Sequence, residues 1–303
     1  MQTQDKIEFY KKRTLGERFS AASDFVRQNW KLLLKNVAYI GIPLAILQGY
    51  FMQNYVQNIF SIIYGRAFED VNWLNLIMLF VVSSALFFFL FSMTGSILYN
   101  YNKGNLDENS GWNELQGDMF SILGKYILQG LIVSGVTVVI ILLFGLLIGG
   151  LAFTGGSMVS GVVGVILILL LYAVLFALMP PFALMIYPII FEKASPWEAI
   201  VKGFRLGFKN WGTVFLTVFL AYLLAGMITN TISMPYFINM IFNISQGGGE
   251  GGIMDYFLVM MASASYVIIY PVATIFIGFQ YTSIVEKEEG ISLQNKIDDF
   301  EEL

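Results

Sequence analysis

The chain has 303 residues, of which 57% are hydrophobic and 13% charged, and its 17 basic and 21 acidic side chains give a net charge of −4. Soluble domains average about 25% charged residues, so this composition argues against an ordinary soluble domain. The sequence has no cysteine and no histidine. This excludes disulfides, thiolate chemistry, imidazole acid–base catalysis and zinc sites built on either residue.

Six apolar stretches are long enough to cross a bilayer, whose hydrocarbon core takes about 20 residues per helix. They lie at about 36–55, 73–98, 127–152, 159–187, 211–234 and 256–283, and none contains a charged residue. Continuous apolar runs differ from the alternating strands of a membrane barrel, and a helix satisfies its own backbone in lipid. We therefore predict an all-α membrane protein with six transmembrane helices. Residues 1–285 form a single integral-membrane domain, and residues 286–303 form an acidic cytoplasmic tail.

The basic residues are distributed unevenly between the two sides of the predicted spans. With six spans, sixteen of the 17 lysines and arginines lie on one side, and the other side holds only Arg66. Because basic loops stay in the cytoplasm, both termini are predicted to be cytoplasmic in a bacterial inner membrane. No cleavable signal peptide is recognisable, so the first span is expected to serve as a signal anchor.

Amphipathic helical patterns precede the first, third and fifth predicted spans. Their apolar faces carry Leu15, Phe19, Ala22, Val26 and Trp30 in the first, Trp112, Leu115, Met119, Leu123 and Tyr126 in the second, and Trp197, Ile200, Phe204, Phe208 and Trp211 in the third. Charged residues, among them Arg18, Glu198 and Arg205, occupy the opposite faces. This pattern is typical of helices that lie in the membrane interface. We predict three repeats, each an interfacial amphipathic helix followed by a transmembrane hairpin.

One segment carries a resemblance to a known family. Residues 179–215 read MPPFALMIYPIIFEKASPWEAIVKGFRLGFKNWGTVF. This stretch resembles bacterial integral-membrane proteins related to the membrane domain of glycerophosphodiester phosphodiesterase. The matching positions are Pro180, Pro181, Pro188, Glu192, Glu198, Ala199, Arg205 and Trp211. The catalytic domain of that family uses histidines and metal-binding acids, and this chain has no histidine. The resemblance therefore implies a membrane scaffold without catalytic residues.

Two sets of candidate site residues follow from these patterns. The candidate interfacial or hinge residues are Trp30, Arg18, Tyr126, Pro180, Pro181, Glu198, Arg205 and Trp211. The candidate polar lining within the last two spans consists of Thr229, Asn230, Thr231, Ser263, Ser265 and Gln280. The prolines act either as hinges or as static kinks, and the polar residues either line a path or form hydrogen bonds between helices. Gly145, Gly149 and Gly150 have the spacing of a close helix contact.

The absence of charged residues from the predicted spans limits the classes of function that the protein can have. Ion-coupled carriers place acidic or basic residues within their spans, and none is predicted here. We expect a non-enzymatic scaffold or subunit that binds the lipid bilayer or a partner membrane protein, or that self-associates, with no catalytic residue, metal, cofactor or nucleic acid. The alternative is an uncoupled transporter, channel or lipid-translocating protein. The acidic tail is either a solvated end or a docking segment for a basic partner.

Overall fold

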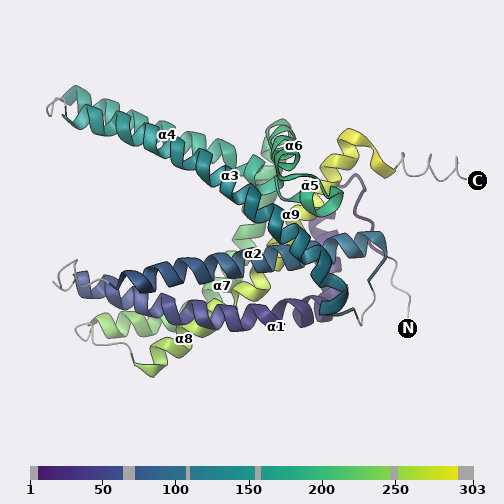
Figure 1. Ribbon diagram of the computed structural model, residues 1–303, viewed down its shortest axis with the longest axis horizontal. Helices are drawn as coiled ribbons and strands as arrows, with labels where there is room; N and C mark the ends of the chain where they lie inside the picture. The colour runs from purple at the N-terminus through teal and green to yellow at the C-terminus, as the bar shows by residue number, and fades with distance from the viewer. Residues whose placement is uncertain (1–5, 64–71, 107–109, 154–157, 246–251, 293–303) are drawn as a thin grey trace, which may run out of the picture. The chain divides into compact units, whose positions relative to one another are not determined.

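The computed structural model describes residues 6–63, 72–106, 110–153, 158–245 and 252–292. The predicted acidic tail lies outside the described residues from residue 293 onward, and so does Arg66. Within the described ranges the regular structure is helical and contains no strand (Figure 1). Six of the helical stretches are long and apolar enough to cross a membrane. The prediction of an all-α membrane protein with six spans is therefore confirmed.

The first three helices are all longer than the predicted spans, α1 and α3 by far the most. They are α1 (Leu15–Ile63), α2 (Trp73–Lys103) and α3 (Trp112–Phe153). In α1 and α3 the predicted amphipathic stretch and the following span form one continuous helix, and Pro43 lies inside α1 without dividing it. Thr14 immediately precedes α1, and both its N–H and its hydroxyl donate to the Glu17 carboxylate, as expected of a helix N-cap with an acid three residues on.

The fourth and sixth predicted spans are each interrupted. The span predicted at 159–187 divides into α4 (Met158–Leu184) and α5 (Tyr187–Glu192), and α6 (Pro196–Lys209) follows as a separate helix. Next, α7 (Trp211–Ser245) runs well beyond the predicted end at residue 234. The last span divides at Ser265 into α8 (Ile253–Ala264) and α9 (Tyr266–Glu289). Hydropathy alone does not reveal such breaks, because the residues on both sides are equally apolar.

The chain divides into two compact units, one of residues 1–123 and 216–303 and one of residues 124–215. In the first unit α1 packs against α2, α8 and α9. A Cβ atom built on Gly49 of α1 would lie 2.7 Å from the Cα of Met260 in α8, so only glycine allows this approach of the two helices. In the second unit α6 packs against α4 and α5. The predicted single domain over residues 1–285 stays a prediction.

Candidate functional site

The second unit is organised around the break between α4 and α5. Pro188 stands in the first turn of α5, where a missing N–H costs no helical hydrogen bond. The side-chain amide of Gln129 in α3 donates to the carbonyl of Met185 at 2.7 Å, within the break. Lys125 of α3 donates to the carbonyl of Ala194 at 3.1 Å, just beyond the end of α5. The helix dipole favours the Lys125 cation at the C-terminal end of α5. The hydrogen bonds of Gln129 and Lys125 together hold the broken segment in place.

A capping box begins α6. The Ser195 hydroxyl accepts a hydrogen bond from the Glu198 N–H at 3.4 Å, and the Glu198 carboxylate accepts one from the Ser195 N–H at 2.9 Å. The hydrogen bond from the Ser195 backbone, with that from its side chain, holds the pKa of Glu198 below its ordinary value of 4.5. The sequence placed Glu198 in an interfacial helix, and the structure shows that it closes the first turn.

Glu198→Gln is expected to lower the unfolding temperature of the solubilised protein at pH 7. A carboxyl group whose pKa falls on folding stabilises the folded state above its unfolded pKa, and this contribution disappears as the pH drops through the folded value. The difference from wild type should therefore close below about pH 4. Thermal unfolding across this pH range provides the measurement. Glu114→Gln, in the first turn of α3, is the matched control, and an equal pH dependence in both variants would contradict the capping role.

One buried face of α6, hereafter the glycine face, packs against the end of α4 and the residue that follows it. Ala199, Gly203, Leu206 and Gly207 are buried. A Cβ atom on Gly207 would lie 2.5 Å from the Cα of Pro181, and one on Gly203 would lie 2.5 Å from the Cα of Met185. This face differs from the predicted apolar face, because backbone-to-backbone contact selects glycine rather than large apolar residues.

The other two faces of α6 are exposed and differ in chemistry. An apolar stripe, hereafter the aromatic stripe, contains Trp197, Val201 and Phe208, which are 64%, 52% and 50% exposed. Arg205 and Lys209 are exposed beside it, and Lys202 forms an ion pair with Glu192 at 2.9 Å. Since α6 connects the candidate spans Gly161–Glu192 and Trp211–Asn243, it lies where the chain leaves one span and starts the next. An aromatic stripe bordered by basic residues at this level is typical of a membrane-surface helix.

The remaining predicted interfacial residues lie at different places. Trp211 donates its indole N–H to the carbonyl of Ala177 at 3.0 Å and thereby ties the start of α7 to α4. Tyr126 and the pair Pro180 and Pro181 are buried in α3 and α4. Trp30, in α1, is 52% exposed. Within the amphipathic stretch of α1, the most deeply buried apolar residues are Ala22 and Phe25 rather than the full predicted face.

Arg18 belongs to a polar cluster within the first unit. Its Nη1 and the Thr217 hydroxyl both donate to the side-chain oxygen of Gln280, the latter at 2.9 Å. The Nε of Arg18 donates to the carbonyl of Arg13 at 2.9 Å. Gln280 is fully buried. These hydrogen bonds join side chains of α1, α7 and α9, which indicates a role in holding the three helices together.

The N-terminal segment, residues 6–14, packs against α1, α2 and α9. Phe9 is 2% exposed, and its ring lies 4.8 Å from that of Phe279, 5.7 Å from that of Phe25 and 5.8 Å from that of Tyr101, measured between centroids. The Arg13 N–H donates to the Ser283 hydroxyl at 3.1 Å. The beginning and the end of the described chain are thus joined through one aromatic cluster.

The six candidate lining residues do not form one surface. The hydroxyls of Thr229 and Thr231 donate to carbonyls of their own helix, at Ala225 and Met227, and Asn230 is exposed. Ser263 and Ser265 are buried near the break between α8 and α9, and Ser265 donates to the Ala262 carbonyl at 2.6 Å. Gln280 belongs to the Arg18 cluster. Of the six, only Thr231 lines the groove described next.

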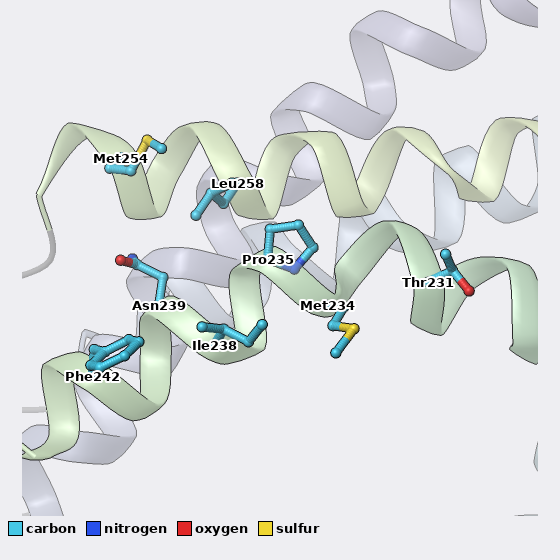
Figure 2. Close-up of a pocket in the computed structure, with 8 residues that line it drawn as sticks. All are labelled: Thr231, Met234, Pro235, Ile238, Asn239, Phe242, Met254 and Leu258. Atoms are coloured by element: carbon cyan, nitrogen blue, oxygen red, sulfur yellow. The ribbon is translucent and has the colours of Figure 1, made fainter.

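A groove of about 460 Å³ lies between α7 and α8 (Figure 2). It is lined by Thr231, Met234, Pro235, Ile238, Asn239, Phe242, Met254 and Leu258. Pro235 and Asn239 point from α7 toward α8, and Leu258 points back from α8. Because proline has no N–H, Pro235 leaves the Thr231 carbonyl without its usual helical donor. The sequence reasoning overlooked this groove, although Pro235 and the apolar residues around it were a signal.

A buried carboxylate stands beside the groove. Asp255 is 4% exposed. It accepts hydrogen bonds from the side-chain amides of Asn239 and Asn243, the latter at 2.8 Å, and from the Gly252 N–H at 2.8 Å. We call the side chains of Asn239, Asn243 and Asp255 the Asp255 cluster. The spacing of Gly252 and Asp255, an acid three residues after a potential N-cap, could have identified it.

The described residues thus define a multi-pass, all-α membrane protein with an exposed amphipathic helix in one unit and an apolar groove in the other. Among them, no three acidic side chains lie close enough together to hold a metal ion. No protein-family model, curated protein or solved structure matches the chain.

The glycines singled out in the sequence have no close neighbour in the described part of the second unit. A Cβ atom built on Gly145, Gly149 or Gly150 would meet no other atom within 4 Å. The described residues therefore give no support to the predicted packing role of these three glycines.

Proposed function

We propose that this protein is a non-enzymatic scaffold or subunit of a bacterial inner membrane that binds lipids or a partner membrane protein. The observation that carries the proposal is the geometry of α6. Its glycine face fixes it against α4, while its aromatic stripe and neighbouring basic side chains stay exposed between two candidate spans. The resemblance of residues 179–215 to the membrane domain of glycerophosphodiester phosphodiesterase is part of the same proposal.

A spin label on α6 tests this proposal directly. The chain has no cysteine, so Val201→Cys and Lys209→Cys each give a single labelling site on the full-length protein in lipid vesicles. Amphipathic helices bury their apolar face about 5–10 Å into the headgroup and acyl boundary. The label at residue 201 should therefore be relaxed by oxygen and protected from a water-soluble nickel reagent, whereas the label at residue 209 should show the opposite.

Lipid binding and binding of a partner protein predict different accessibilities of the label at residue 201. Protection of residue 201 from both reagents would indicate a protein contact on the aromatic stripe, and so a partner or a second copy. Free access of the nickel reagent to residue 201 would place the stripe in water and refute the proposal.

The proposed orientation has both termini in the cytoplasm. It is supported by the distribution of basic residues, with sixteen of 17 on the side of the termini. An alkaline phosphatase reporter fused after residue 60 should then be active outside the cytoplasm, and an inactive fusion with normal expression would reverse the orientation.

An uncoupled transporter or lipid-translocating protein is the second candidate. The observation that favours it is the interruption of the last span at Ser265, since transporters build substrate sites from discontinuous helices. The same vesicles should then move fluorescent lipid or an uncharged solute faster than protein-free vesicles, and equal rates would exclude this role.

A further inference from the structure

The α7–α8 groove has the dimensions of a lipid chain in one leaflet. It extends from Phe242 to Thr231 along α7, which at 1.5 Å per residue corresponds to roughly 16 Å. One leaflet contributes about half of the 30 Å hydrocarbon core, or roughly 15 Å. Both helices lie in candidate membrane spans. The groove therefore runs over about the depth that an acyl chain occupies.

The groove walls are apolar and remain exposed in the protein. Met234, Phe242 and Met254 are each 58% exposed, and Ile238 is 44% exposed. Methionine side chains adapt to ligands of irregular shape. In a bilayer such a surface faces hydrocarbon, so an aliphatic chain is the occupant that matches its chemistry.

The end of the groove near Asn239 collects hydrogen-bond acceptors. Asn239 and Asn243 turn their NH₂ groups toward Asp255, so their carbonyl oxygens remain as acceptors next to the carboxylate. No described lysine or arginine pairs with Asp255, and the hydrogen bonds that described residues donate to its carboxylate come from amides. A buried carboxylate without a cation attracts a positively charged donor. An ammonium group, with several N–H donors and no acceptor, satisfies this arrangement.

We propose that the α7–α8 groove binds one phospholipid, with an acyl chain between the helices and a primary ammonium headgroup at the Asp255 cluster. Phosphatidylethanolamine has this chemistry. Phosphatidylcholine carries the same charge without N–H donors, and phosphatidylglycerol has no cation. This inference rests on the lipid arm of the proposed function and names the lipid class and the site.

Native mass spectrometry of the full-length protein, released from detergent after exposure to equal amounts of the three lipids, tests the site. One phosphatidylethanolamine should be retained per chain in preference to the other two. Asp255→Asn should lower its retention about tenfold, because it removes a charge-assisted contact. Since Asp255 also caps α8, a second variant is needed that leaves the cap intact.

Met234→Trp is that variant, because it fills the groove from an exposed position. Its control is Met227→Trp, on the same helix and 60% exposed but outside the groove. Met234→Trp should abolish retention and Met227→Trp should preserve it. Equal retention of all three lipids by the wild type, or unchanged retention in Met234→Trp, would overturn the inference. Lipid contact of the label at residue 201 would then still support the proposed function, so the two failures are distinguishable.

Discussion

Gly207→Ala is expected to detach α6 from the end of α4 and to destabilise the second unit by about 3 kcal/mol. The added Cβ would lie 2.5 Å from the Cα of Pro181 and 2.7 Å from its backbone nitrogen. Neither atom can turn away as the end of a flexible side chain would. The two helices must therefore separate, and the contacts of the whole glycine face are lost. Thermal unfolding of the detergent-solubilised protein provides the measurement.

Gly212→Ala is the matched control, because a Cβ atom there would meet nothing within 4 Å. Gly203→Ala should resemble Gly207→Ala, since it places a Cβ 2.5 Å from the Cα of Met185. If Gly207→Ala and Gly212→Ala unfold at the same temperature, the close packing of α6 on α4 is wrong.

Phe9→Ala is expected to cost the first unit about 3–5 kcal/mol, the range for removing a fully buried aromatic side chain. The ring of Phe9 contacts those of Phe25, Tyr101 and Phe279, so its loss leaves a cavity shared by α1, α2 and α9. The N-terminal segment should then become accessible to protease. Limited proteolysis, read by N-terminal sequencing of the fragments, together with thermal unfolding, measures both effects.

Phe80→Ala serves as the control for this prediction. Phe80 is 73% exposed on α2, and in a bilayer its ring faces lipid, which is as apolar as the side chain. Its removal should have little effect. Comparable losses in the two variants would show that the cluster around Phe9 does not stabilise the unit.

Hydropathy was sufficient to predict the six spans, because lipid requires long apolar helices and the sequence contains six. The face of α1 was harder to predict. Phe25 is buried because Phe9 and Phe279 contact it, and those residues lie in distant parts of the sequence. Periodicity within one helix records which residues are apolar, but not which neighbour covers them.

The same limit explains why the sequence did not predict the contact face of α6 or the residues around the α7–α8 groove. Large apolar residues suggested the contact face of α6, whereas the structure uses Gly203 and Gly207. Small residues carry little hydropathy signal even where they decide the packing. The Asp255 cluster combines side chains of α7 and α8, so the sequence pattern at Gly252 and Asp255 does not show that Asn239 and Asn243 belong to it.

The first unit combines residues 1–123 with residues 216–303, which has a consequence for biosynthesis. When α1 and α2 leave the ribosome, the partners that cover them in α8 and α9 have not yet been made. At about 5–20 residues per second, the roughly 150 residues between the end of α2 at Lys103 and the start of α8 at Ile253 take on the order of 8–30 s to translate. During that interval the nascent N-terminal helices reside in the membrane with an uncovered face. Translation of α8 and α9 then supplies the contacts that cover this face.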